Sequence, residues 1–542
     1  MSSKVPNNQK YKSLNQSVHD QTDDLTSVSN TLLPDESNLD STNTNNYKHN
    51  NRSNDNEIFN QDNNNYNSEE FELETLNNLD YEISIEEDDI TTTASNTQTS
   101  SQDQGGSSNM KMAFMNMTNS ILGAGIIGQP LAFKNSGLIG GIVVMIILTY
   151  LIDWTLILIV KNSILTNTKS YQDTVYKSFG MGGKIILLFS ICSFAYGGCM
   201  AFCVIIGDTI PHVIRIFLPN SIVENNQWNW IISRNFIISI FTICISYPLS
   251  LNRDISKLAK ASAFALLGMF IIVLLTLIRA PFVSSELRGD ISISDFLINK
   301  NIFQGISVIS FALVCHHNTM FIYQSISNKN LKKFKKLTHL SCIISMIFCM
   351  IMGINGFINF KSNTKGNILN NFKSNDNWIN IARFCFGLNM LTTFPLEIFV
   401  VRDVIKEILL SKKAATQGLT SSDFELSKIQ HFLITTFLVF SSMLVSLFTC
   451  NLGIILELIG ATSASLMAYI LPPLCYLKLN YKNLGGNWSK LDKQEKRNFL
   501  ISKFLPCISC VIFGFAIMFI SSGMTIMDAI NNKDESDHCV VD

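Results

Sequence analysis

The sequence predicts an all-α polytopic membrane protein with about eleven transmembrane helices. Apolar runs of about 20 residues, each long enough to cross about 30 Å of hydrocarbon, recur from residue 112 almost to the C-terminus. The chain is 47% hydrophobic and 15% charged, although its first fifth is strongly polar. It lacks the alternating segments of about ten residues that a transmembrane barrel requires. The apolar runs and the composition argue against a soluble globular protein, and the lack of alternation argues against a transmembrane barrel.

The polar N-terminal region, residues 1–108, is expected to be a disordered cytosolic tail. Asn, Ser, Asp and Thr dominate it, and an acidic patch follows at EFELETLNNLDYEISIEEDD. Its apolar residues are too sparse to offset the entropy lost on ordering, and it lacks the pattern of a signal peptide. A transmembrane domain is expected over 109–525, followed by a short acidic tail over 526–542 on the non-cytosolic side.

The membrane spans follow one another at short intervals. They are expected near 112–133, 138–160, 184–211, 231–250, 257–278, 302–326, 338–359, 380–401, 429–450, 452–475 and 503–523. Lys and Arg gather in alternate connections, most densely at 329–336 and 478–497. This bias predicts that those connections and the N-terminal tail lie in the cytosol.

Cysteine usage indicates neither metal nor redox chemistry. The 13 Cys lie almost wholly within apolar runs and show no CxxC spacing, which is typical of small buried side chains. The formal net charge of −1 is unevenly placed and identifies no charged partner. We therefore expect no cofactor, no metal and no nucleic-acid partner for a chain embedded in the lipid bilayer.

The first span contains a stretch that a continuous helix would avoid. Residues 118–132, TNSILGAGIIGQPLA, hold Gly123, Gly125 and Gly128 followed by Pro130. Gly is a poor helix former, and Pro removes a backbone donor. A helix that breaks here would expose backbone N–H groups, which secondary transporters use to hold an anionic substrate group near the bilayer midplane. Close helix packing through small residues is the alternative.

The sixth span repeats this anomaly. It reads GISVISFALVCHHNTMFIYQSI, with Cys315, His316, His317 and Asn318 at its centre. Polar residues at this depth are costly unless they line protein or water. Interrupted spans that lie five apart are typical of a five-plus-five inverted repeat. Adjacent histidines point about 100° apart on a helix, which disfavours a metal site; a hydrogen bond to a neighbouring helix is the structural alternative.

Four segments of the chain resemble the amino acid/auxin permease family. They are NSILGAGIIGQPLAFKNSG, SFALVCHHNTMFIYQSI, LTTFPLEIFVVRD and LIGATSASLMAYILPP, in this order over about 110–525. The chain is most similar to the fungal vacuolar amino-acid transporters and the related system A/N neutral amino-acid transporters. The resemblance implies the LeuT-like inverted-repeat fold, with eleven spans of which helices 1 and 6 are discontinuous. It also implies amino-acid transport coupled to H⁺ or Na⁺. Many relatives have Cys-His-Pro in the sixth span. This chain has Cys315-His316-His317 instead, and in this it resembles the organellar branch of the family.

The resemblance implies that the substrate is held at the two breaks. The α-carboxylate is expected on the backbone N–H groups around Gly123, Ala124 and Gly125. The α-ammonium is expected on carbonyl groups of the sixth-span break near Phe311.

Polar side chains near the breaks are expected to complete the pocket. Asn119 and Ser120 precede the first break, and Asn318 lies in the sixth span. Tyr196, in the segment SFAYGGC of the third span, could add a hydroxyl to the carboxylate. A packed aromatic side chain without contact to substrate is the alternative for Tyr196.

The driving ion is expected to be H⁺, with Na⁺ as the alternative. In this fold class, hydroxyl groups of the eighth span can join first-span carbonyls in a Na⁺ site, and Thr392 and Thr393 match that position. A lone Thr in a membrane helix usually bonds its own backbone, however. An acidified organelle would make H⁺ the natural driving ion.

The proton carrier is expected to be the pair His316 and His317, because an unperturbed imidazole titrates near pH about 6.5. His316 is preferred, since the wider family shares the Cys-His pair. The other histidine is expected to hold a hydrogen bond between helices. Glu457, deep in the tenth span, ranks second. Asp208, expected to be solvated near the end of the third span, ranks third.

Glu397 in the eighth span lies five positions before Arg402, and a structural ion pair between them is the simplest interpretation.

The expected function is transport of neutral amino acids across a vacuolar or other endomembrane by alternating access, with a monomeric transport unit. A membrane amino-acid sensor of the same fold would share every motif. A channel would want a ring of like residues around a symmetric pore, which the sequence does not show. An integral-membrane enzyme is a third class, and we expect no enzymatic activity.

Overall fold

The computed structural model of the chain describes residues 109–218, 229–253, 262–417, 425–449, 451–483 and 493–531. Within these ranges the chain is helical apart from short connections, and it forms no β-strand. The predicted tail over 1–108 and the last part of the predicted C-terminal tail, 532–542, lie outside the described residues.

The first span is broken where the glycines predict. Helix α2 (Met110–Leu122) ends at Gly123, and a 3₁₀ turn, η1 (Ala124–Gly128), follows. Helix α3 (Gln129–Ser136) completes the span. Pro130 lies in the first turn of α3, where its missing N–H would have had no helical acceptor. The predicted discontinuity of the first span is confirmed.

The sixth span is broken in a similar way. Helix α12 (Ile302–Leu313) ends at Val314, which is extended, and α13 (His316–Ser325) begins after Cys315. The interruption therefore falls within the polar centre of the span, as expected. This second discontinuity is also confirmed.

The remaining spans are more continuous. They are α4 (Leu138–Leu165); α5 (Tyr171–Phe217); α7 (Arg234–Phe241), η3 (Thr242–Ser246) and α8 (Tyr247–Ser250) in succession; α10 (Ser262–Arg279); α14 (Leu331–Phe360); α15 (Asn377–Gln417); α16 (Lys428–Phe448); α17 (Leu452–Ile459), η9 (Gly460–Ala464), η10 (Leu466–Ile470) and α18 (Leu471–Asn483) in succession; and α19 (Lys493–Phe499), η12 (Leu500–Phe504) and α20 (Leu505–Asn531) in succession. Within the described residues, 9 helical segments are long and apolar enough to cross a membrane. The shorter segment Arg234–Ser250 and the broken first span complete the expected set of about eleven.

Short elements occupy the connections between spans. They are η2 (Asn229–Ile232), η4 (Ala280–Phe282), η5 (Ser285–Leu287), α11 (Ile293–Phe296), η6 (Lys361–Asn363) and η7 (Ile368–Asn371).

Several helices extend beyond the spans that the sequence predicts, α15 among them. Helix α5 begins at Tyr171, well before position 184, and it kinks at Gly180, where φ is 71°. Glycine adopts this left-handed conformation without the clash that a Cβ would introduce. Helix α20 continues past the expected boundary at 525 to Asn531.

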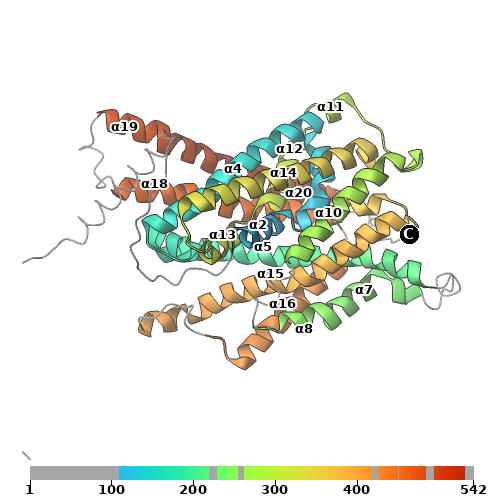
Figure 1. Cartoon of the computed structure of the whole chain (residues 1–542), viewed down its shortest axis with the longest axis horizontal. Helices are drawn as coiled ribbons and strands as arrows, with labels where there is room; N and C mark the ends of the chain where they lie inside the picture. Colours follow the sequence, from blue (N-terminus) through green and yellow to red (C-terminus); the bar gives the residue numbers. More distant parts are fainter. Residues whose placement is uncertain are drawn as a thin grey trace, which may run out of the picture. The chain divides into compact units, whose positions relative to one another are not determined.

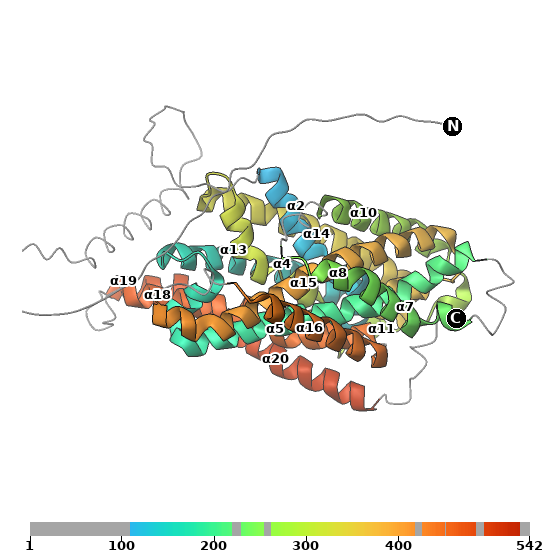
Figure 2. The same cartoon turned by 90° about the horizontal axis from the view of Figure 1, so that it is seen from below.

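The two broken spans pack against each other and against the long helices around them. Helix α12 contacts both α3 and η1, and α14 contacts both α2 and α3. Figure 1 shows α5 and α15 running alongside each other, and these two helices are in contact. Figure 2 shows α10 beside α14, with which it is also in contact. Broken spans that lie five apart and pack together are the arrangement that a five-plus-five inverted repeat predicts.

Candidate functional site

The first break provides both open space and a close approach of two helices. A Cβ on Gly123 would meet no heavy atom within 4 Å, so space lies beside this residue. A Cβ on Gly125 would overlap Ala312 of α12. The first backbone N–H groups of a helical segment lack intrahelical acceptors. Those at the start of η1, from Ala124 onward, are therefore available to a ligand at this break.

The sixth break presents carbonyl groups on one side and N–H groups on the other. Val314 N–H donates to Ser310 O over 3.1 Å as α12 ends. The carbonyls of the last α12 residues, Phe311 to Leu313, lack the N–H donors that a further helical turn would provide. The negative end of the α12 dipole and the positive end of the α13 dipole thus meet at Cys315.

A chain of polar side chains joins the two broken spans to the eighth. Asn318 Nδ2 donates to Ser120 Oγ over 2.9 Å, which connects α13 to α2. The same Nδ2 lies 2.9 Å from His317 Nε2. His317 Nε2 lies 3.8 Å from Glu397 Oε1 on α15. Polar groups from three spans therefore meet beside the breaks.

Aromatic rings cover one side of this chain. The ring of Phe194 on α5 lies 5.1 Å from the His317 ring and 5.4 Å from the Phe311 ring. All three side chains are buried. These rings exclude water from His317 on that side and so strengthen the electrostatic interactions made there.

The two adjacent histidines have different partners. His316 Nε2 lies 2.9 Å from Thr155 Oγ1 on α4, and Thr155 donates its hydroxyl to Leu151 O. With the Thr155 hydroxyl donating to Leu151 O, His316 Nε2 acts as the donor to Thr155, a role that is open to both the neutral and the protonated ring. Nδ1 is buried and has no hydrogen-bond partner among the described residues. His316 thus makes a bond between helices, and His317 faces the polar chain. The preference for His316 as the proton carrier stays a prediction that these contacts do not test.

Comparison with known proteins gives the same family as the motifs. Residues 106–527 match the family described as "Transmembrane amino acid transporter protein". The chain belongs to this family. It is 50% identical over 436 residues to "Vacuolar amino acid transporter 2" of Saccharomyces cerevisiae, covering 80% of this chain and 86% of that protein.

Two further similarities were found. The chain is 33% identical over 381 residues to "Putative sodium-coupled neutral amino acid transporter 11" of Mus musculus, covering 70% of this chain and 80% of that protein. A solved structure, "Crystal structure of MhsT in complex with L-phenylalanine", aligns with a TM-score of 0.44 and 12% identity, covering 77% of this chain and 100% of that one.

Ser120 and Asn318 bond each other beside the breaks, and the two other predicted pocket side chains, Asn119 and Tyr196, lie outside this bond. Asn119 is partly buried on α2. Tyr196 donates its hydroxyl to Ser441 Oγ of α16 over 2.9 Å. This bond directs the Tyr196 hydroxyl to α16, as the packed-aromatic interpretation anticipates.

The hydroxyls predicted for a Na⁺ site bond their own helix. Thr392 Oγ1 donates to Asn389 O over 2.9 Å, and Thr393 Oγ1 donates to the same carbonyl over 2.8 Å. Each hydroxyl oxygen keeps lone pairs that could accept a cation. The geometry is that of ordinary membrane-helix threonines.

The expected ion pair between Glu397 and Arg402 does not form. Arg402 Nη1 donates to Ser250 O over 2.8 Å and to Thr435 Oγ1 over 3.0 Å. Glu397 instead faces His317. Residues five apart on a helix point in different directions, so Arg402 reaches the neighbouring α8 and α16 while Glu397 faces inward. A carboxylate within an apolar span marked Glu397 as notable in the sequence. The sequence indicated Arg402 as its partner, whereas the side chain faces His317.

Glu457 lies in a buried polar cluster away from the His317 chain. Its Oε1 accepts from Asn135 Nδ2 over 2.9 Å, and its Oε2 accepts from Thr525 Oγ1 over 3.1 Å and from Gln304 Nε2 over 3.3 Å. Gln304 Nε2 also donates to Asp528 Oδ2 over 2.8 Å. The cluster therefore ties α3, α12, α17 and α20 together.

Asp208, expected to be solvated, is buried. Only 5% of its side chain is exposed, and Arg234 Nε lies 3.5 Å from its Oδ1. Its Oδ2 accepts from Asn367 over 3.3 Å and from Asn370 over 3.0 Å. The helix α7 and the turn η7 cover this end of α5, which the sequence could not show. Asp208 is thus part of a structural cluster.

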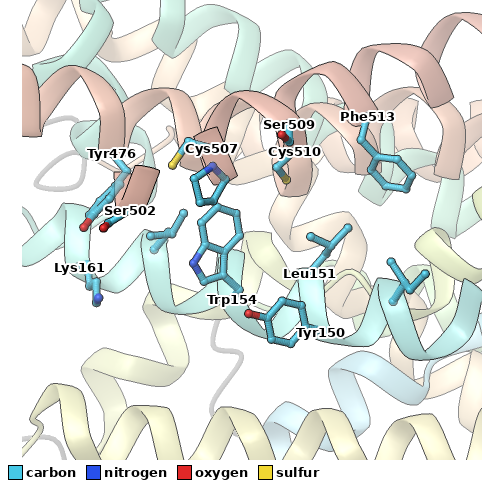
Figure 3. A pocket seen from close by; sticks show the side chains of 13 residues that line it. Tyr150, Leu151, Trp154, Lys161, Tyr476, Ser502, Cys507, Ser509, Cys510 and Phe513 are labelled. Atoms are coloured by element: carbon cyan, nitrogen blue, oxygen red, sulfur yellow. The ribbon is translucent and has the colours of Figure 1, made fainter. Parts of the chain in front are cut away.

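A hollow of about 640 Å³ lies on a different face of the fold. Figure 3 shows Trp154, Leu151 and Lys161 of α4 opposite Cys507 and Phe513 of α20. None of the residues around the two breaks lines it. We do not assign this hollow to the substrate.

Proposed function

We propose that this protein is a secondary active transporter that moves neutral amino acids across a vacuolar or other endomembrane. Transport is coupled to H⁺ and proceeds by alternating access around a midplane site. The observation that carries the proposal is the meeting of the two breaks, with Gly125 against Ala312 and open space at Gly123. Broken helices of this kind hold substrate and ion in secondary transporters.

The substrate class follows from the charges that the breaks present. The free N–H groups at Ala124 and Gly125 suit an α-carboxylate. The carbonyls at the end of α12, including that of Phe311, suit an α-ammonium. Ser120 and Asn318, which are hydrogen-bonded to each other, lie three residues from Gly123 and Cys315 at the two breaks. Membership of the amino acid transporter family supports this assignment.

Location and orientation rest on similarity and charge. The vacuolar name of the yeast relative supports a vacuolar membrane. The Lys-rich connections support a cytosolic N-terminus. Because one chain supplies both breaks, the proposed transport unit is a monomer.

H⁺ is the proposed driving ion because a histidine and a carboxylate face each other beside the breaks, at His317 and Glu397. Thr392 and Thr393 already donate to their own helix, which gives Na⁺ less specific support. The sodium-coupled name of the mouse relative makes Na⁺ the alternative to test.

The deciding experiment is flux through the purified chain in sealed proteoliposomes. A radiolabelled mixture of neutral L-amino acids is supplied under an imposed pH gradient without Na⁺, and separately under a Na⁺ gradient at equal pH on both sides. We expect uptake with the pH gradient only, above protein-free vesicles. Uptake with the Na⁺ gradient alone would contradict H⁺ coupling. Binding without flux under either gradient would identify a sensor instead.

A further inference from the structure

Glu397 is a partly buried carboxylate whose hydrogen bonds are incomplete. Its side chain is 15% exposed, and its Oε2 is buried without a hydrogen-bond partner among the described residues. Its Cγ lies beside Gly198 of α5, where an added Cβ would come within 3.9 Å. An ionised carboxylate in a membrane interior is costly unless it is paired. Glu397 therefore requires a proton or a cationic partner for at least part of the transport cycle.

The partner within reach is His317. Its side chain is 3% exposed, and its Nδ1 is buried without a hydrogen-bond partner among the described residues. The amide nitrogen of Asn318 can only donate, so His317 Nε2 accepts from it at 2.9 Å and the ring is neutral in this arrangement. Once protonated, Nε2 can no longer accept from Asn318. A carboxylate acceptor for the new N–H, Glu397 Oε1, lies 3.8 Å away, and a small ring movement would reach it.

We propose that His317 and Glu397 together bind the transported proton, and that protonation moves His317 Nε2 from Asn318 to Glu397. A hydronium O–H bond breaks as the His317 N–H bond forms on one side of the membrane, and this N–H bond breaks as the proton returns to water on the other side. Asn318 also holds Ser120 beside the first break. Protonation therefore changes the hydrogen bonding of a residue in the substrate site, which couples the two ligands.

The other charged and titratable groups near Glu397 do not provide an alternative partner. On α5, the thiol of Cys199 is the titratable group that interacts with Glu397. On α13, His316 bonds Thr155. On α15 itself, Arg402 bonds α8 and α16, and Glu407 pairs with Lys184 of α5. Among the described residues, His317 is thus the group placed to share a proton with Glu397.

The inference rests on the proposed transport function, and the test separates the two. Substrate affinity is measured on the purified full chain with the radiolabelled neutral amino-acid mixture at pH about 5.5 and about 7.5, on either side of the usual imidazole pKa. Coupled ligands change each other's affinity by about 5- to 150-fold. We expect a change of at least about fivefold in the wild type and less than about twofold in Glu397→Gln and His317→Gln. Labelled amino-acid exchange in proteoliposomes records whether each variant still transports.

A second carboxylate–imidazole pair supplies the matched control. Asp153 of α4 lies 2.6 Å from His339 of α14, whose side chain is 53% exposed. Asp153→Asn removes a carboxylate from an equivalent pair outside the site and should keep the wild-type pH response. If Glu397→Gln does not fold, His317→Gln decides alone. A wild-type pH response in a folded Glu397→Gln or His317→Gln variant overturns the inference. Absence of flux in the wild type would instead refute the proposed function.

Discussion

Asn318 Nδ2 donates a hydrogen bond to Ser120 Oγ over 2.9 Å, and this bond joins the two broken helices within one turn of each break. Ser120 lies three residues before Gly123, where α2 ends, and Asn318 lies three residues after Cys315, where α13 is capped. The bond therefore links the two helix ends that we propose to hold the substrate. Any movement of α2 relative to α13 during transport must stretch or break it.

Removal of the Asn318 amide should weaken substrate binding. Asn318→Ala deletes the bond to Ser120, and a hydrogen bond of this kind contributes about 1 kcal/mol, or roughly fivefold in affinity. We expect the KM for amino-acid uptake to rise by that order. Asn359→Ala is a suitable control, because Asn359 donates to Asn355 of its own helix. An unchanged KM in folded Asn318→Ala would contradict the assignment of this residue to the site.

The two glycines of the first break should respond differently to substitution. A Cβ at Gly125 overlaps Ala312, so Gly125→Ala should lower stability by about 1–3 kcal/mol, the range for overpacked sites. The double variant Gly125→Ala/Ala312→Gly removes the overlap with the Ala312 Cβ but keeps the overlap with its Cα, so it should restore only part of the loss. Thermal unfolding followed by size-exclusion chromatography measures both effects. Equal stability of Gly125→Ala and the wild type would refute the close contact.

Gly123→Ala addresses the open space directly. Nothing lies within 4 Å of the added Cβ, so the packed neighbours need not move. A methyl group in this space would compete with a bound amino acid, and we expect weaker binding in a chain that still folds. Affinity for the labelled neutral amino acids is the measurement. If Gly123→Ala binds as the wild type does, the substrate does not occupy this space.

We expect Glu457 to stabilise the fold and not to carry the coupled proton. Glu457→Gln replaces a carboxylate that accepts from Asn135, Gln304 and Thr525 with a group that has one acceptor oxygen. Disruption of such a buried network costs about 1–3 kcal/mol. We expect a lower thermal midpoint together with a wild-type pH response of substrate affinity. A flattened pH response with unchanged stability would instead favour Glu457 as the proton carrier.

The sequence was sufficient for the features that depend on local backbone chemistry. Clustered glycines before Pro130 predicted the first break, and three consecutive polar residues predicted the second. It was not sufficient for contacts between helices. The rotation of each helix about its own axis decides whether Glu397 faces Arg402 or His317, and whether His316 or His317 faces the site. That rotation is set by packing between distant segments, such as Gly125 against Ala312.

Burial at the ends of spans was equally hard to predict. Asp208 lies near the end of its apolar run, which favoured solvation from the sequence. Arg234 at the start of α7, and Asn367 and Asn370 in the connection that follows α14, enclose it. Glu457 likewise receives its partners from three other spans. Neither set of partners is near in sequence.

His316 should prove to be a residue that joins helices. Its Nε2–H donates to Thr155 Oγ1, and interhelical hydrogen bonds in membranes average about 0.6 kcal/mol, with a maximum of about 1.7. Thr155→Val and His316→Phe each remove this bond, and the double variant should lose less stability than the sum of the two. A double-mutant cycle on thermal or denaturant unfolding measures that coupling.

The same two variants distinguish the histidines functionally. Protonation of His316 would add an N–H at Nδ1, which is buried without an acceptor among the described residues, whereas protonation of His317 would add an N–H at Nε2, 3.8 Å from Glu397 Oε1. We expect Thr155→Val and His316→Phe to keep the pH response of substrate affinity, whereas His317→Gln loses it. Loss of the pH response in His316→Phe, with no coupling to Thr155 in the cycle, would reassign the proton to His316 and restore the preference that the sequence favoured.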